Sequence, residues 1–253
     1  MVRVRKTMTA PRRVRLRPVR PAGWWFDGLL LVGFVALTLA LVNGYLLGTD
    51  LVVRDWVDAH RPDVAYWIAR VFNYLGQGGW LLTPVASVLA VLVSLRTRSI
   101  RPLLVVAAAF LLTYLTIGPL KFLLVRGYPH NWDLAHPEQL FSDPENGSAY
   151  PSGHVANAIV WYGVIALLLA ALLRTLGRPD VPPKLYQAIR IAPPAIVFVT
   201  TTYLGFHWLT DSIAGLLLGW FLDRLLARVP WDDLPLPALP RGLGRAGVFT
   251  TGS

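Results

Sequence analysis

Six long runs of hydrophobic residues, separated by short polar segments, set the pattern of the chain. Each run is close to the roughly 20 residues of helix that cross about 30 Å of hydrocarbon. The runs occupy residues 24–48, 79–95, 102–125, 155–173, 191–206 and 209–226. The first run is longer than the apolar part of a signal peptide, so we expect a retained helix. The pattern predicts an all-α fold, a polytopic membrane protein built as a six-transmembrane-helix bundle.

Three segments outside these runs have patterns of their own. Residues 1–23 form a basic arm, since the first twenty hold eight Lys or Arg and no acid. Residues 50–77 mix charges with scattered Trp and Tyr, which predicts a short amphipathic helix at the membrane interface, placed where it could cover a site. Residues 229–253 are rich in Pro and Gly, which predicts a flexible tail. We therefore expect one transmembrane domain over residues 24–228, between an arm and a tail.

Composition agrees with a membrane environment and excludes several classes of function. Hydrophobic residues make up 55% of the chain and charged residues 15%, whereas soluble domains carry about a quarter charged residues. The net charge of +10 does not indicate a nucleic-acid partner, because the basic residues lie between the apolar runs and not on one face. Since cysteine is absent, disulfides, thiolate metal sites and cysteine nucleophiles are excluded.

The charges between the runs predict an orientation in the membrane. The arm, the turn at residues 96–101, the segment at residues 174–190 and the tail are basic and fall on one side, which should be cytoplasmic. The opposite side carries acidic residues between the third and fourth runs: Asp133, Glu138, Asp143 and Glu145. We expect a multi-pass protein of the cell inner membrane with both termini in the cytoplasm.

Three separated groups of polar residues should meet at the extracytoplasmic level. They are Lys121 and Arg126 at the end of the third run, residues 151–154 at the start of the fourth, and His207 with Asp211 between the fifth and sixth. Ionisable groups at membrane depth are costly unless they are paired or used. Such a cluster therefore predicts a functional site.

The residue types suit the transfer of a phosphoryl group. Lys121 and Arg126 supply positive charge for phosphate oxygens. Ser152 and Gly153 lie where a loop becomes a helix, where free backbone N–H groups can bind an anion.

The remaining groups suit attack at phosphorus. His207 can attack through an unprotonated ring nitrogen, and Asp211, four residues on, could hold the other nitrogen. His154 is then the imidazole that can protonate the departing alkoxide and later activate water.

Three motifs resemble those of the type 2 phosphatidic acid phosphatase superfamily. They read Lys121-Phe-Leu-Leu-Val-Arg126, Pro151-Ser152-Gly153-His154 and Gly205-Phe206-His207-Trp208-Leu209-Thr210-Asp211. The resemblance covers residues 121–215 and implies the same six-helix layout. It further implies that His207 is the nucleophile, Asp211 its partner and His154 the acid and base. Lys121, Ser152 and Gly153 would bind phosphate, with no metal and no cofactor.

Two of the three motifs depart from the pattern of that superfamily. The first motif usually ends in Arg-Pro, but this chain has Tyr128-Pro129; the third usually opens with Ser-Arg, but here the residues are Thr200-Thr201. We expect Arg126 to carry more of the phosphate binding, with hydroxyl donors from Tyr128 and Thr201.

Together these features predict a metal-independent phosphatase acting on a lipid phosphate or diphosphate, of polyprenyl or phosphatidate type, through a phosphohistidine intermediate at the extracytoplasmic face. Its partners would be that substrate and the membrane lipids. Two alternatives stay open: a phosphotransferase using a sugar or lipid acceptor, and a non-catalytic lipid-phosphate binder or transporter. Residues 130–136 hold groups able to ligate a metal, but their spacing matches no zinc signature. No pattern specifies the oligomeric state.

Overall fold

The computed structural model describes residues 21, 23–237 and 243–249, and in these residues the only regular secondary structure is helical. Its elements are α1 (Trp24–Val42), α2 (Leu47–Ala59), α3 (Asp63–Asn73), the short turns η1 (Tyr74–Gly76) and η2 (Gly78–Leu82), α4 (Thr83–Thr97), α5 (Arg101–Leu124), α6 (Gly153–Thr175), α7 (Pro183–Tyr203) and α8 (Leu209–Arg228). The predicted all-α class is confirmed. Most of the predicted arm lies outside the described residues.

Four helical segments have the length and composition of membrane spans. They are Trp24–Val42, Gly78–Thr97, Arg101–Leu124 and Gly153–Thr175. The helices α7 and α8 hold 21 and 20 residues, but both carry charged side chains. The chain is thus a membrane protein with at least these four candidate spans among its described residues, and the number six remains a prediction.

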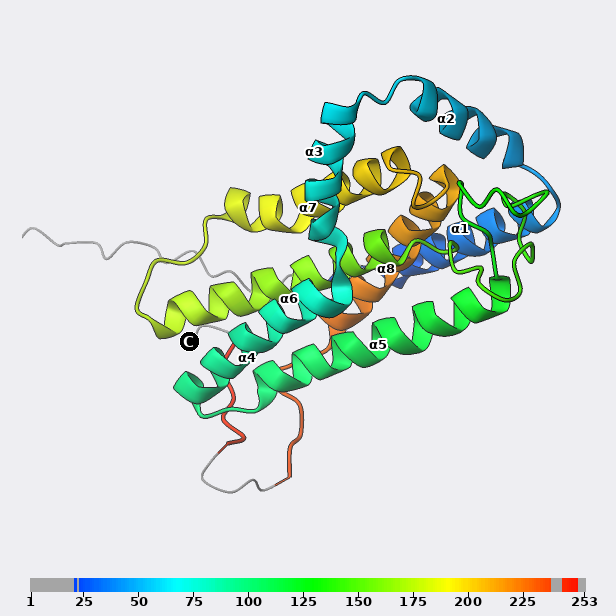
Figure 1. Cartoon of the computed structure of the whole chain (residues 1–253). Helices are drawn as coiled ribbons and strands as arrows, with labels where there is room; N and C mark the ends of the chain where they lie inside the picture. The colour runs from blue at the N-terminus through cyan, green and yellow to red at the C-terminus, as the bar shows by residue number, and fades with distance from the viewer. Residues whose placement is uncertain (1–20, 22, 238–242, 250–253) are drawn as a thin grey trace, which may run out of the picture.

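Helix α6 lies at the centre of the bundle, against α4, α5, α7 and α8, while α1 packs on the outer side of α8 (Figure 1). The close approach of α8 to α6 depends on two glycines. A Cβ at Gly215 would lie 2.5 Å from the Ser152 carbonyl oxygen, and one at Gly219 would lie 2.9 Å from Ala156 Cα. Small residues at this spacing let helix backbones meet. This packing brings the start of α6 next to the start of α8.

The segment before α4 differs from the sequence prediction in two ways. The first helix ends at Val42 and does not continue to Gly48, because Gly44 and Leu46 have φ angles of 80° and 69°. Residues 50–77 form two helices in place of one, separated by a turn that contains Pro62, whose ring restricts the preceding backbone. Helix α3 runs across α7, and α2 packs against α7 and α8 (Figure 1).

The described part of the tail is packed, where the sequence predicted a flexible extension. Val248 and Phe249 are buried in the main hydrophobic cluster, and their N–H groups donate to the Asp232 carboxylate at 2.8 and 2.9 Å. The buried Arg101 guanidinium donates to backbone carbonyls of the tail, including that of Arg245 at 3.1 Å. Apolar periodicity could not predict this packing of the tail, because the packing involves only two hydrophobic residues, Val248 and Phe249, together with backbone carbonyl groups.

Candidate functional site

A cavity of about 730 Å³ opens at the end of the bundle where α5 ends and α6 begins. Four of the predicted site residues line it: Lys121, Tyr128, His154 and His207. They come from α5, the following loop, α6 and the segment between α7 and α8. The tertiary structure therefore brings together the three motifs that are far apart in the chain.

The two histidines face each other edge to face. Their ring centroids are 5.6 Å apart, with an interplanar angle of 67°. At this separation both imidazoles are within reach of one phosphoryl group placed between them. Lys121 lines the same cavity, and its Nζ donates to the Ser148 carbonyl oxygen.

The tautomer of His207 follows from its hydrogen bond. Its Nδ1 lies 2.7 Å from the Ala149 carbonyl oxygen. Because a carbonyl oxygen can only accept, Nδ1 carries the hydrogen and Nε2 keeps its lone pair. The side chain is 4% exposed, and this burial lowers the pKa of His207. The ring is thus held neutral, in the form that a nucleophile requires.

Asp211 contacts His207 less directly than the sequence predicted. Its Oδ2 is 3.7 Å from Nδ1 of His207, beyond hydrogen-bond length, and accepts from the Trp208 N–H at 2.9 Å. Its Oδ1 accepts from Arg126 at 2.5 Å. The carboxylate therefore lies near the imidazole as a buried negative charge, while the Ala149 carbonyl orients the ring.

Arg126 does not line the cavity, where the sequence predicted that it would bind phosphate. Its side chain is 0% exposed and pairs with Asp50 at 2.6 Å as well as with Asp211. It also donates to Thr210 Oγ1 at 2.8 Å and to the Glu138 carbonyl at 2.8 Å. The sequence could not show this, because Asp50 belongs to α2 and meets the motifs only after folding.

Ser152, Gly153 and Thr201 lie beside the cavity and do not line it. Ser152 caps α6, since its Oγ accepts from Val155 N at 3.4 Å and its own N–H donates to the Asp211 carbonyl. Gly153 lies against Lys121, because a Cβ there would be 3.4 Å from Lys121 Cε. The Thr201 hydroxyl is buried and has no hydrogen-bond partner within the described residues.

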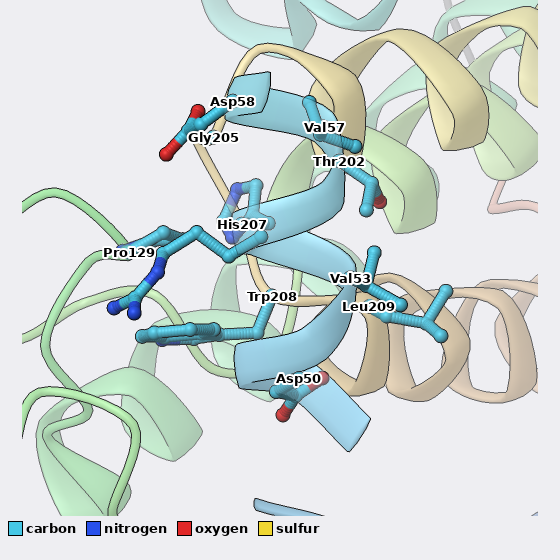
Figure 2. Close-up of a pocket in the computed structure, with 11 residues that line it drawn as sticks. Asp50, Val53, Val57, Asp58, Pro129, Thr202, Gly205, His207, Trp208 and Leu209 are labelled. Atoms are coloured by element: carbon cyan, nitrogen blue, oxygen red, sulfur yellow. The ribbon is translucent and has the colours of Figure 1, made fainter. Parts of the chain in front are cut away.

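Helix α2 packs against the segment that contains His207. Figure 2 shows three side chains of α2 close to residues that follow α7: Asp50, Val53 and Val57 lie close to His207, Trp208 and Leu209. Only about 10 Å³ of free space remains between them, about the size of a single water molecule's probe sphere. This close packing limits movement of His207 away from the cavity.

Several cavity residues were missed by sequence reasoning. They come from the α2–α3 segment: Arg61, Tyr66, Arg70, Asn73, Tyr74 and Gln77. Gln77 Nε2 lies 3.2 Å from Nε2 of His154 and so constrains that ring. The available signal was the helical spacing of residues 66, 70, 73 and 77 within the segment predicted to be amphipathic.

The two histidines of the loop at residues 130–136 contact separate carboxylates. His130 contacts Asp58 at 3.0 Å and His136 contacts Glu138 at 3.2 Å. Within the described part of the chain, no three His, Asp or Glu residues are grouped as metal ligands would be.

Comparisons with known proteins find curated relatives of this chain. The chain is 30% identical over 146 residues to an undecaprenyl-diphosphatase of Sulfolobus acidocaldarius, covering 58% of this chain and 62% of that protein. It is 34% identical over 82 residues to phosphatidylglycerophosphatase B of Bacillus subtilis, covering 32% and 39% respectively. The matches thus span less than two thirds of these curated relatives.

The fold has a solved counterpart. The crystal structure of a transmembrane PAP2 type phosphatidylglycerolphosphate phosphatase from Bacillus subtilis superposes with a TM-score of 0.64 at 23% identity, covering 79% of this chain and 93% of that one. The model of the PAP2 superfamily matches residues 102–234, which include all three motifs. The chain therefore belongs to the PAP2 superfamily.

Proposed function

We propose that this protein is an integral-membrane phosphatase that hydrolyses a lipid phosphate or diphosphate through a phosphohistidine on His207. One observation carries the proposal: His207, His154 and Lys121 line a single cavity, and the Ala149 carbonyl holds His207 in the nucleophilic tautomer. Both curated relatives have names that denote phosphatases, one for undecaprenyl diphosphate and one for phosphatidylglycerophosphate. These names support a substrate whose phosphate is attached to a lipid.

The proposed reaction has two steps. In the first, Nε2 of His207 attacks the terminal phosphorus. The P–O bond to the leaving group breaks, where the leaving group is the lipid alcohol of a monophosphate or the lipid monophosphate of a diphosphate, and His154 donates a proton to the departing oxygen. In the second, His154 takes a proton from a water molecule whose oxygen attacks phosphorus, so that the P–N bond to His207 breaks and phosphate is released. Lys121 stabilises the charge on the phosphoryl oxygens in both steps. The buried Asp211 stabilises the positive charge that develops on His207.

We further propose six membrane spans, with α7 and α8 as the fifth and sixth. Twenty residues of helix extend about 30 Å, the thickness of the hydrocarbon layer. Charges of these helices are paired: Arg190 of α7 binds Asp223 of α8 at 2.6 Å, and Asp27 of α1 binds Arg224 at 2.5 Å. Pairing lowers the cost of placing ions near the membrane.

We propose from the basic loops that both termini lie in the cytoplasm of the cell and the cavity at the extracytoplasmic face of the inner membrane. The membrane domain proposed from the sequence covers residues 24–228.

The test is a phosphate-release assay on the purified full chain in detergent, with polyprenyl phosphates and phosphatidate as substrates and EDTA present throughout. We expect release by the wild type and none by His207→Ala. His136→Ala is a matched control, because this histidine is exposed and lies outside the cavity. Mass spectrometry of the rapidly quenched protein should locate phosphate on His207. Full activity of His207→Ala would contradict the proposed mechanism. Loss of wild-type activity in EDTA would contradict it as well.

A further inference from the structure

Helix α3 and the turn after it present a stripe of polar residues to the cavity. Tyr66, Arg70, Asn73 and Gln77 all line it. The spacing of four and three residues places Tyr66, Arg70 and Asn73 on one face of α3, and Gln77 follows the turn η1. Part of the cavity wall is therefore built by a segment that precedes all three motifs in the chain.

The opposite face of α3 is apolar and exposed. Val64, Trp67, Ile68 and Val71 have exposed fractions of 73%, 63%, 53% and 65%. Such a face suits the boundary between head groups and acyl chains. Helix α3 can thus rest in the outer leaflet while its polar stripe points to the site, at the depth where a lipid phosphate would lie.

Arg70 is the unpaired cation of this stripe. Its guanidinium lies 5.5 Å from the ring centroid of Phe206, directly before His207 in the chain, and has no ion-pair or hydrogen-bond partner among the described residues. The neighbouring Arg61 is already engaged, because it pairs with Asp58 at 2.9 Å and donates to the Tyr203 carbonyl at 2.7 Å.

The cavity has a charge that favours an anion. No Asp or Glu belongs to its described lining, which includes Arg61, Arg70 and Lys121. A phosphate group carries a charge near −1.5 to −2 at neutral pH, whereas the buried Arg126 is already neutralised by two carboxylates. Lys121 alone would leave a doubly charged phosphate incompletely compensated. Arg70 offers a planar group of donors suited to phosphate oxygens.

We propose that Arg70, from α3, binds the phosphate of the lipid substrate together with Lys121. Arg70 would bind phosphate as the sequence predicted for Arg126. Helix α3 would then both cover the cavity and contribute to the positive charge of its wall. This inference rests on the proposed function in taking the anion to be the substrate's own phosphate.

Two measurements test the proposal, one of them independent of turnover. Thermal unfolding of the full chain in detergent, with and without inorganic phosphate, reports anion binding; steady-state phosphate release reports KM and kcat. The variants are Arg70→Gln, Arg70→Lys and the control Arg178→Gln, an exposed arginine after the far end of α6.

We expect phosphate to raise the Tm of the wild type and Arg178→Gln, and to have little effect on Arg70→Gln. The KM of Arg70→Gln should rise about 10- to 100-fold, the usual effect of losing a charge-assisted hydrogen bond, and Arg70→Lys should recover part of the loss. A merely structural role would lower the Tm without phosphate and leave the phosphate-dependent shift intact.

The outcomes separate this proposal from the proposed function. If no lipid phosphate is hydrolysed but phosphate stabilises the wild type and not Arg70→Gln, Arg70 binds the anion and the phosphatase assignment fails. If Arg70→Gln keeps the wild-type phosphate shift and KM, the Arg70 proposal is overturned even though the enzyme is a phosphatase. Absence of any phosphate-dependent shift in the wild type would also overturn it.

Discussion

Arg126 and Asp211 form an ion pair of 2.5 Å in which both side chains are 0% exposed. The pair continues to Asp50 of α2 at 2.6 Å, so that one guanidinium joins α2, the loop after α5 and the start of α8. The network lies beside His207 and outside the cavity. Its position indicates that Arg126 holds these three segments together and does not line the cavity.

Replacing Arg126 should therefore affect stability first. Arg126→Met leaves the carboxylates of Asp50 and Asp211 buried without their cation, which typically costs about 3 to 5 kcal/mol. We expect a large fall in Tm and in the yield of folded protein, measured by thermal unfolding in detergent. The triple variant that adds Asp50→Asn and Asp211→Asn should be less destabilised, because it removes the unpaired charges. Wild-type stability of Arg126→Met would contradict the structural role.

Replacing Lys121 should affect activity and leave stability nearly unchanged. Lys121 lines the cavity and has no carboxylate partner among the described residues. Lys121→Met should lower kcat for phosphate release about 10²- to 10³-fold, as expected when a group stabilising transition-state charge is lost. Its Tm should stay close to that of the wild type. A large fall in Tm with unchanged kcat would show that Lys121 serves the fold and not the reaction.

Substituting Gly215 should disturb the close approach of the two motifs at the starts of α6 and α8. A Cβ there would lie 2.5 Å from the Ser152 carbonyl oxygen, so Gly215→Ala must push α8 away from the start of α6. Overpacking of this kind costs about 1 to 3 kcal/mol, and it would also separate His207 from His154. We expect both Tm and kcat to fall.

Gly118→Ala is the matched control for this change, since a Cβ at Gly118 of α5 meets nothing within 4 Å. We expect it to keep wild-type Tm and kcat. Equal falls in Tm and kcat for the two substitutions would contradict the role of the α6–α8 contact, because alanine is the better helix former and does not lower Tm through helix propensity.

Lowering the pH should destabilise the protein through His207. Burial lowers the pKa of this histidine in the folded state from its usual value of 6.5. Between the folded and unfolded pKa values the unfolded chain binds more protons, so stability rises with pH. The contribution is fully present above about pH 6.5 and is lost as the pH falls through the folded pKa.

The measurement is Tm against pH from neutral to mildly acidic conditions, for the wild type and His207→Gln. The wild-type curve should fall more steeply below about pH 6.5, because glutamine has no proton to gain. Parallel curves would show that His207 is not held neutral by burial. The acid limb of kcat/KM should likewise lie below the ordinary histidine range.

The sequence by itself determined the two helices that carry the first two motifs, α5 and α6. Long apolar runs can satisfy their backbone only as helices in a membrane, so the predicted spans at residues 102–125 and 155–173 differ from α5 and α6 by two residues at most at either end. The motif spacing likewise predicted the meeting of Lys121, His154 and His207, because helices of similar length that alternate in direction return to the same level.

Only the tertiary structure decided which cations are free to meet a ligand. Arg126 and Arg70 are both arginines, and nothing in the sequence shows which of them is paired with carboxylates. Folding places Arg126 between two carboxylates, whereas Arg70 lies at the cavity wall with no ion-pair or hydrogen-bond partner in the part of the chain that the structure describes. The orientation of His207 depends on a backbone carbonyl, that of Ala149, which every residue type possesses. Such contacts arise from distances between remote segments, which one-dimensional patterns do not encode.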